Sequence, residues 1–421
     1  MRSKSSVGVV SAVLVGAVVV QGAHAQSIEW SLPLDGFWDD ASNWSPADVP
    51  DTALDNAELG LMSSYHVRSV MDLVLGGLVI SNPDATLTFD PPTSTSIFGS
   101  IENHGEIILA STTSPNNSLD FLFQSSITGH GTVRLAADIN PTEVALNSIA
   151  QVLTIGSGQS ILGSGVVEGL IENHGEIIAD SLSSANMVLG GTITQSGSAR
   201  IGAVDSTLIL KQGATVAGGE LFTTGSGEML VLDGVVLDGV ENAGTIKLFG
   251  NNRAVRVAGS MTNHGLFHVN SNDGTADAKL LIEHDVVIGG DGSIRLQESD
   301  SNFASIGIDV ASDSTLTIGE NQVLEGSGEV VLGSGSRLVN NGVLVGNDPD
   351  HVLRVEGDVE GGGRYESVGG QLEVHGSFPV DGQYSAENGM LRLVSVRNDE
   401  DGMISGLVLS TGAGGVIDLG G

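Results

Sequence analysis

The chain of 421 residues contains no cysteine, few aromatic residues and few basic ones. Without cysteine, disulfides and Cys-type metal sites are excluded, so the hydrophobic core has to be large enough on its own. Aromatic residues make up only 4% of the chain, whereas glycine occurs 60 times. A composition with few aromatic residues and many glycines differs from that of an enzyme with an aromatic core. It favours many short strands separated by turns.

Basic residues are so scarce that the formal net charge is −35. A charge of this sign makes nucleic acid and anionic membrane surfaces poor partners. It favours solubility and a weak attraction of divalent cations, and a solvated acidic surface explains it without a dedicated calcium site.

Long hydrophobic runs are missing after the N-terminus. Residues 1–25 combine Arg2 and Lys4 with an apolar run from Val7 to Val20 and then Ala23-His24-Ala25, the order of a secretory signal peptide. No stretch reaches the roughly 20 apolar residues that a membrane-spanning helix needs. We therefore expect cleavage after Ala25 and an exported protein that does not span a membrane.

Short phrases repeat along almost the whole chain. The octapeptide IENHGEII occurs at residues 101–108 and again at 171–178, and related phrases of the form apolar-x-Asn-x-Gly-x-apolar begin at 240, 261 and 338. The Asn and Gly types at these positions tolerate a positive φ, so we expect turns between strands there. The predicted turn residues are Asn103, Gly105, Asn173, Gly175, Asn242, Gly244, Asn263, Gly265, Asn340 and Gly342.

Two further phrases complete the repeat. One has the form apolar-x-Gly-x-Gly-x-apolar, as in ITGHGTV at 127 and IGGDGSI at 288, and the other is a strand phrase such as STLTI at 314. The strand phrase recurs without interruption at Leu353, Leu372 and Leu391, which defines the shortest step of the repeat. A period of about 20 with alternating β-type residues predicts stacked coils of two or three strands each.

The expected fold is therefore all-β, a parallel, right-handed β-helix or β-solenoid with coils of roughly 20 residues, on the order of 15 to 20 of them. A two-sheet sandwich array is the alternative, although Asn-Gly hairpin signals occur only at 341–342 and 388–389. We expect a signal peptide at 1–25, an N-terminal segment and cap at 26–60, repeats at 61–395, and a C-terminal coil or cap at 396–421. Trp30, Trp38 and Trp44 lie in the predicted cap, either packed on the first coil or exposed as a ligand platform.

A family resemblance adds to this prediction. Residues 36–59, GFWDDASNWSPADVPDTALDNAEL, resemble the N-terminal segment of bacterial autotransporter passenger domains and of related large exported β-helix proteins. The glycine-rich repeats that follow are similar to the coils of these proteins. The resemblance implies an adhesive or structural β-helix, secreted or at the surface of a bacterium. The chain departs from it by ending at GVIDLGG instead of a membrane barrel with a terminal aromatic residue.

Enzymatic and metal-binding motifs are weak. The GHG at 129–131 lacks the acidic and basic partners of a polygalacturonase signature, and phosphate-loop, zinc-helix and nucleophile-elbow motifs are missing. Only Lys211, Lys247 and Lys279 remain as lysines to serve a polysaccharide lyase. No catalytic or cofactor-binding residue is predicted, and calcium is the one candidate cofactor, through the loop acids Asp291, Asp399 and Asp401.

The favoured function is a non-enzymatic surface or extracellular scaffold or adhesin, with extracellular polysaccharide or cell-surface components as candidate partners. The alternative is a carbohydrate-active β-helix enzyme, a polysaccharide lyase or hydrolase. A groove that brings together two or three carboxylates and a His or Arg from adjacent coils would favour the enzyme. Within the two octapeptides, His104 and His174 are separated by about three coils, so one metal ion cannot bridge them.

Overall fold

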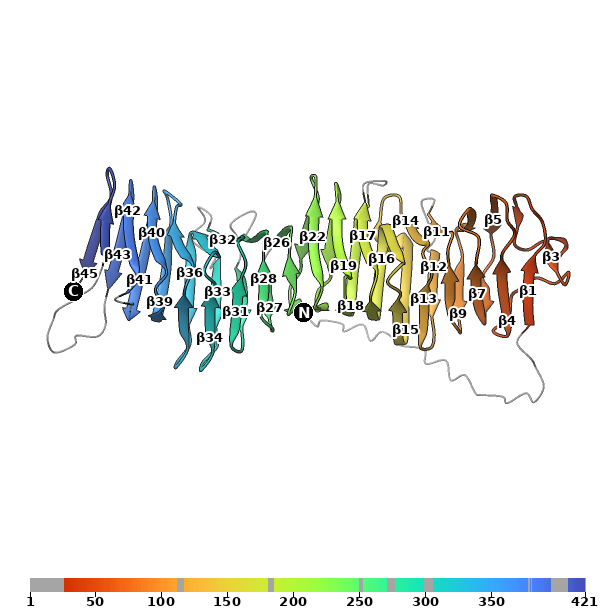
Figure 1. The fold of residues 1–421 in the computed structure, drawn as a ribbon, viewed down its shortest axis with the longest axis horizontal. Helices are drawn as coiled ribbons and strands as arrows, with labels where there is room; N and C mark the ends of the chain where they lie inside the picture. Colours follow the sequence, from red (N-terminus) through yellow and green to blue (C-terminus); the bar gives the residue numbers. More distant parts are fainter. Residues whose placement is uncertain are drawn as a thin grey trace, which may run out of the picture.

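The structure of the protein is a computed structural model that describes residues 26–111, 117–180, 185–249, 253–270, 277–298, 306–377, 379, 381–394 and 408–420. These residues form a parallel β-solenoid with coils of about 22 residues and no α-helix (Figure 1). The predicted fold class is confirmed. Its right-handed sense and the predicted domain boundaries stay predictions.

Each coil has three faces, which follow one another along the chain. Most strands of face 1 belong to this face alone and pair in parallel with the coils before and after: β1 (Gln26–Trp30), β4 (Asp55–Leu59), β7 (Gly77–Ile80), β10 (Ile101–Asn103), β13 (Ser125–Thr128), β21 (Thr215–Ala217), β24 (Val236–Asp238), β27 (Arg253–Val257), β30 (Ala278–Ile282), β33 (Ile306–Val310), β36 (Gly328–Leu332), β43 (Met390–Val394) and β45 (Val416–Gly420).

Face 2 follows face 1 in the coil. Its strands are β2 (Gly36–Phe37), β5 (Tyr65–Ser69), β8 (Ala85–Phe89), β11 (Glu106–Ala110), β14 (Thr132–Ala136), β17 (Glu176–Asp180), β19 (Arg200–Val204), β22 (Glu220–Thr224), β25 (Glu241–Asn242), β28 (Met261–Asn263), β31 (Val286–Gly289), β34 (Thr315–Ile318) and β37 (Arg337–Asn340).

Face 3 closes the coil and leads back to face 1. Its strands are β6 (Leu73–Leu75), β9 (Ser94–Ile97), β12 (Asn117–Phe121), β20 (Thr207–Leu210), β23 (Glu228–Val231), β26 (Thr245–Phe249), β29 (Leu266–Asn270), β32 (Ser293–Gln297), β35 (Val323–Gly326), β38 (Val343–Gly346), β40 (Arg364–Val368), β42 (Gln383–Glu387) and β44 (Val408–Thr411). Five longer strands continue around a corner from one face to the next: β15 (Val144–Ile155), β16 (Ser160–Asn173), β18 (Met187–Gln195), β39 (Val352–Glu360) and β41 (Gln371–Ser377).

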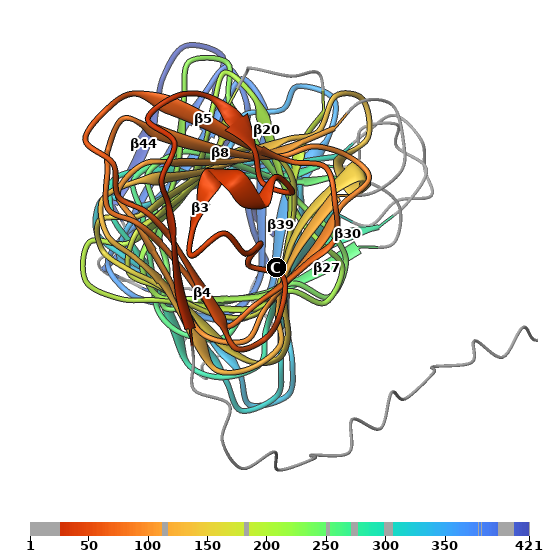
Figure 2. The same ribbon diagram turned by 90° about the vertical axis from the view of Figure 1, so that its right-hand side faces the viewer.

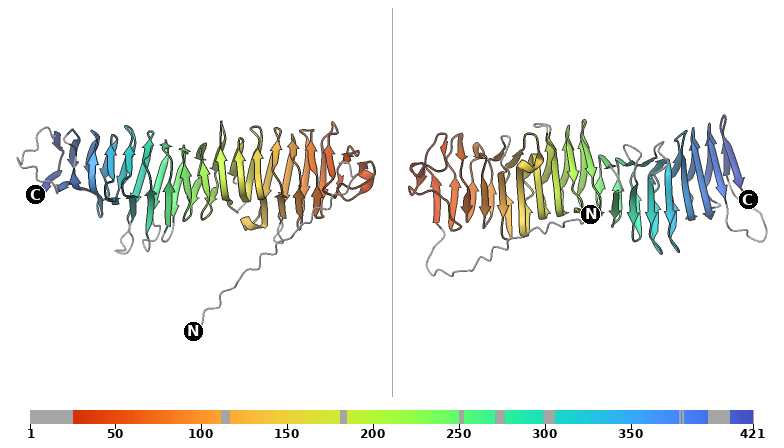
Figure 3. Two further views of the ribbon diagram at one scale, coloured as in Figure 1. Left: turned by 90° about the horizontal axis from the view of Figure 1, so that it is seen from below. Right: turned by 180° about the vertical axis from the view of Figure 1, so that it is seen from behind.

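The core is one continuous column of inward side chains. Alternation along each strand points Leu, Ile and Val to the interior, and the parallel register places equivalent residues above one another. Leu353, Leu372 and Leu391 are such a series, in register on β39, β41 and β43 and fully buried. The strands therefore share a single core along the rod in Figures 1 and 3.

The coils vary in length around the predicted period, with about 22 residues on average. Val355 meets its register partner Val374 after one of the short coils, whereas Ile127 meets its partner only at Ile155, after a much longer one. The longer coil carries a corner loop with a short 3-10 helix, η2 (Pro141–Glu143).

The N-terminal end is covered by the tryptophan segment. The chain leaves β1, forms the 3-10 helix η1 (Ala41–Asn43), and returns through β3 (Trp44–Ser45), which pairs with β1 in antiparallel orientation. Figure 2 shows this segment lying across the end of the solenoid. A cover of this kind shields the end of the core from water.

Candidate functional site

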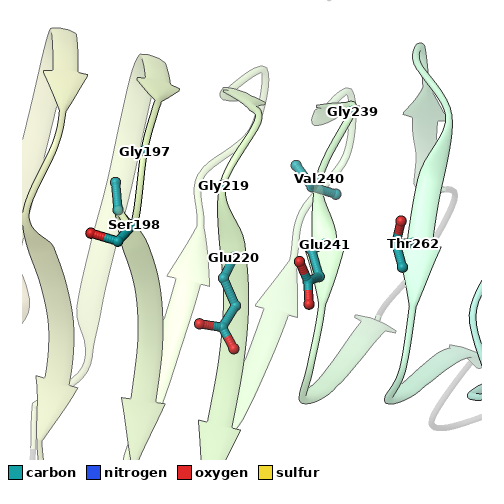
Figure 4. Close-up of a pocket in the computed structure, with 9 residues that line it drawn as sticks. Gly197, Ser198, Gly219, Glu220, Gly239, Val240, Glu241 and Thr262 are labelled. Atoms are coloured by element: carbon teal, nitrogen blue, oxygen red, sulfur yellow. The ribbon is translucent and has the colours of Figure 1, made fainter.

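The corner between faces 1 and 2 carries an open groove of about 490 Å³. It is lined by Gly197, Ser198, Ala199, Gly219, Glu220, Gly239, Val240, Glu241 and Thr262, which come from four successive coils (Figure 4). Gly197, Gly219 and Gly239 have φ values of 67°, 68° and 62°, so these positions require the left-handed conformation that glycine adopts at little cost. The groove therefore follows a line of tight glycine turns.

Two carboxylates lie side by side in this groove. Glu220 on β22 is in register with Glu241 on β25, so their backbones are one strand spacing apart, about 4.8 Å. Both side chains leave the strands on the outer surface (Figure 4). Among the residues that the structure describes, neither carboxylate forms an ion pair, because the nearby bases Arg200 and His264 pair with other acids. Chemically, such a pair can bind a cation or hydroxyl groups, or act as acid and base on a glycosidic bond.

An arginine stands one coil away. Arg200 on β19 is the register partner of Glu220, but its guanidinium bonds to Glu176 on the other side, with Nη2 2.6 Å from Oε1. It also lies 4.8 Å above the centre of the Phe222 ring. Two neighbours thus already hold Arg200, so it does not pair with the groove carboxylates.

The predicted Asn-x-Gly turns lie at two different corners. Asn103 and Asn173 end strands of face 1, whereas Asn242, Asn263 and Asn340 end strands of face 2. All five asparagines are fully buried. In four of the phrases, the side-chain Oδ1 accepts a hydrogen bond at 3.0–3.1 Å from the amide of the glycine two residues on. The phrase is therefore a corner closed by its own asparagine.

The reason for glycine in these phrases differs from the one given by the sequence. A positive φ was expected, but the φ of Gly105, Gly175, Gly244, Gly265 and Gly342 lies outside the left-handed region. Each instead sits against the backbone of the preceding coil, where a Cβ atom would come within 2.0–2.3 Å of a main-chain atom. Close packing of coils, and not backbone conformation, excludes a side chain there.

Positive φ occurs in the second repeat phrase. Gly129, Gly290 and Gly361, each the first glycine of an apolar-x-Gly-x-Gly phrase, have φ values of 104°, 105° and 95°. Each lies directly against an asparagine of the previous coil, namely Asn103, Asn263 and Asn340. The two phrases therefore form a two-coil unit in which a glycine corner stacks on an asparagine corner.

The histidines of the octapeptides are surface residues without a shared site. His104 lies 3.2 Å from Glu102 and packs against the His130 ring, whereas His174 bonds to Ser196. Ile101 is in register with Ile127, Ile127 with Ile155, and Ile155 with Asn173. The two copies of the octapeptide therefore lie three coils apart. In the part of the chain that the structure describes, no three His, Asp or Glu residues gather as metal ligands would.

Asp291, one of the candidate calcium ligands, is engaged elsewhere. Its Oδ1 lies 2.6 Å from Nδ1 of His264 on the exposed surface. The hydrogen bond from His264 lowers the pKa of Asp291, and the same bond raises the pKa of His264. Asp399 and Asp401 lie outside the described residues.

The three tryptophans form a packed cap and not an open platform. Trp30, Trp38 and Trp44 are at most 2% exposed, and Trp44 meets the other two rings edge-on at 5.0 and 4.7 Å between centroids. Nε1 of Trp38 donates to the Pro50 carbonyl, and Nε1 of Trp44 donates to the Trp38 carbonyl. A stacking platform requires free ring faces, so the platform interpretation does not fit this structure.

Sequence reasoning missed Glu220 and Glu241 because they are separated by a whole coil and belong to no motif. Aligning TVAGGEL at 215 with VLDGVEN at 236 by the coil period would have placed the two glutamates in register.

Among the described residues, no helix is long and apolar enough to cross a membrane. No protein-family model matches the chain, and neither the curated proteins nor the solved structures contain a significant match.

Proposed function

We propose that this protein is an exported, non-enzymatic β-solenoid that acts as an extracellular or cell-surface scaffold or adhesin. The observation that carries the proposal is the continuous stack of parallel strands around a single core. Such a rod has a stiff axis and three long faces, so it can separate partners or present repeated contacts without moving parts. The resemblance of residues 36–59 to autotransporter-like β-helix proteins supports an exported, surface-associated role.

The alternative function is a carbohydrate-active enzyme, and the Glu220–Glu241 pair favours it. Retaining glycosidases use two carboxyl groups about 5 Å apart, a separation close to one strand spacing. An enzyme would also need a His or Arg from an adjacent coil beside the two carboxylates. Arg200 does not fill this place, because it is bound to Glu176 and Phe222. We therefore place this function second.

One experiment separates the two functions. The chain without residues 1–25 is incubated with a panel of neutral and acidic polysaccharides, and both retention and new reducing or unsaturated ends are measured. The scaffold proposal expects retention without new ends, equally in the wild type and in a Glu220→Gln, Glu241→Gln variant. New ends that disappear in this variant would establish the enzyme and overturn the scaffold.

A further inference from the structure

An apolar ridge runs along the corner between faces 3 and 1. It consists of Phe98, Phe123, Ile149 and Leu170, one residue from each of four successive coils. Phe123, Ile149 and Leu170 are 52%, 59% and 46% exposed, whereas Phe98 is partly buried. The two phenylalanine rings touch, with centroids 5.4 Å apart and planes inclined by 48°. The ridge is therefore an apolar strip parallel to the rod axis.

Ile149 lies where the register between β15 and β16 shifts. Asn147 on β15 pairs with Glu168 on β16, but the next residue of β15 to pair is Val152, opposite Leu170. Four residues of β15 thus lie opposite the single Gly169. Strand alternation points Ala145, Asn147 and Ile149 outward, so Ile149 is an exposed apolar side chain at the start of this extra chain.

The shape of the ridge restricts what can bind to it. Its four side chains offer on the order of 300 Å² of apolar surface, because large side chains bury 150–250 Å² when fully covered. A stable protein interface needs about 800 Å² per partner and a broad face. A strip one residue wide fits a linear polymer that lies along the axis.

The chemistry of the ridge and of its border points to a polysaccharide. Ring and aliphatic surfaces pack against the C–H faces of sugar rings, and nearby hydroxyls can bond to sugar hydroxyls. Ser100 and Ser126 provide such hydroxyls at the same corner, with their Oγ atoms 3.1 Å apart. The net charge of −35 repels uronate and sulfated chains, so the polymer has to be neutral.

We propose that the ridge of Phe98, Phe123, Ile149 and Leu170 binds a neutral polysaccharide chain along the rod axis. The inference deepens the proposed adhesin function and rests on it. The residues of the ridge supply apolar contact, and coil spacing repeats this contact at intervals of about 4.8 Å.

The test is affinity electrophoresis in gels that contain a soluble neutral glucan, with polygalacturonate as the anionic comparison. Phe123→Ser and Ile149→Ser are compared with Val287→Ser, a matched control that is 46% exposed on face 2. We expect the glucan to retard the wild type and the control, with about tenfold weaker binding for the two ridge variants. Thermal midpoints within a few degrees of the wild type verify that all variants are folded.

Several outcomes would overturn the ridge proposal: no retardation by the glucan, retardation by polygalacturonate instead, or glucan binding that survives both ridge substitutions. A ridge variant that converts a dimer to a monomer in size-exclusion chromatography would identify a protein interface and also overturn it. The reducing-end assay on the same samples tests the parent proposal separately. Glucan binding elsewhere on the rod, without new ends, would agree with the adhesin proposal and contradict only the ridge proposal.

Discussion

At the residue scale, the corner asparagines connect one coil to the next. Nδ2 of Asn103, Asn263 and Asn340 donates to a main-chain carbonyl one coil further on, in each case at 3.1 Å. Oδ1 of Asn103 and Asn340 accepts from a glycine amide in the asparagine's own corner. A buried amide that satisfies both functions in this way stabilises the corner and fixes the register of the next coil.

Gly105→Val tests the close packing of these corners. A Cβ at position 105 would lie 2.3 Å from the Ala85 carbonyl oxygen, which belongs to the backbone and cannot move aside. We expect a loss of about 3 kcal/mol or more in the free energy of unfolding, measured by urea denaturation. His104→Ala, the neighbouring surface change, should cost no more than about 0.5 kcal/mol. Equal midpoints for the valine variant and the wild type would contradict the packing argument.

Asn242→Ala tests the buried amide ladder. Nδ2 of Asn242 donates to Oδ1 of Asn263 at 2.7 Å, and its Oδ1 accepts from the Gly244 amide. Removing the side chain leaves the buried Asn263 side chain and the partly buried Gly244 amide without these bonds, so we expect a cost of about 1–3 kcal/mol in the same denaturation assay. Asn347→Ala, which removes a bond to Glu325 on the surface, serves as the control and should change stability much less. If Asn347→Ala lowered the free energy of unfolding as much as Asn242→Ala, burial of the amide would not explain the loss.

The sequence predicts these residues well but not their roles. Each asparagine and glycine of the repeated phrase lies at a corner, because turn-tolerant residues between apolar strand phrases mark where the chain changes direction. The backbone contact at Gly105 comes from the preceding coil, and no local pattern encodes a contact over that sequence separation. Glu220 and Glu241 escape detection for the same reason, since the coil period alone brings them together.

At the element scale, charged side chains of alternating sign connect the last strands of face 1. Glu329, Arg354, Glu373, Arg392 and Asp418 lie in register on β36, β39, β41, β43 and β45. Ion pairs join every neighbouring pair at 3.3–3.7 Å. Glu373 is the centre of this ladder and only 5% exposed, and His375 donates to it as well. A network around a buried carboxylate contributes more than isolated surface pairs do.

This ladder predicts acid sensitivity of the C-terminal coils. Burial alone would raise the pKa of Glu373, but hydrogen bonds from His375 and Arg354 outweigh it and hold the pKa below its ordinary value of 4.5. A carboxylate with a lowered folded-state pKa stabilises the fold above its unfolded pKa, and this stabilisation is lost as the pH falls through the folded value. We therefore expect these coils to lose stability below about pH 4.5.

Urea unfolding at pH 7 and pH 3.5, followed by the near-UV signal of the stacked pair Tyr365 and Tyr384, measures this loss. Glu373→Gln keeps the size of the side chain but cannot titrate. The variant should be less stable than the wild type at pH 7 and lose less stability on acidification. If both proteins lost the same free energy between the two pH values, Glu373 would not be the responsible group.

Coil length shows what element patterns leave undetermined. The strand phrases give the strands of each face, and the uninterrupted step of Leu353, Leu372 and Leu391 agrees with the observed register. Corner loops such as the one with η2 lengthen other coils, and their polar residues have no period. A solenoid tolerates such insertions because a longer surface loop costs little entropy. The shortest period therefore does not give the length of every coil.

At the scale of the whole molecule, strand pairing joins neighbouring coils, and the longest side-chain contacts, such as Arg134–Asp180 and Lys211–Glu168, reach one coil further. Strand pairing joins each coil to the one before and the one after, so stability is a sum of local contributions and interfaces, and not one global quantity. All three tryptophans lie in the N-terminal cap, where Tyr65 stacks on Trp30, whereas the other two tyrosines, Tyr365 and Tyr384, stack near the other end. Tryptophan fluorescence therefore reports on the first end and the Tyr365–Tyr384 pair on the other. Local unfolding can therefore be located without labels.

Matched substitutions at equivalent corners test this local stability. Gly105 and Gly342 hold the same position in the repeated phrase, and a Cβ would lie 2.3 Å and 2.2 Å, respectively, from a carbonyl of the preceding coil. We expect Gly105→Val to lower the urea midpoint reported by tryptophan fluorescence and to leave the tyrosine signal nearly unchanged, with the reverse for Gly342→Val. A rod that unfolded as one unit would instead show both probes shifting together in both variants, because every coil would then share the cost of a single misfitted corner.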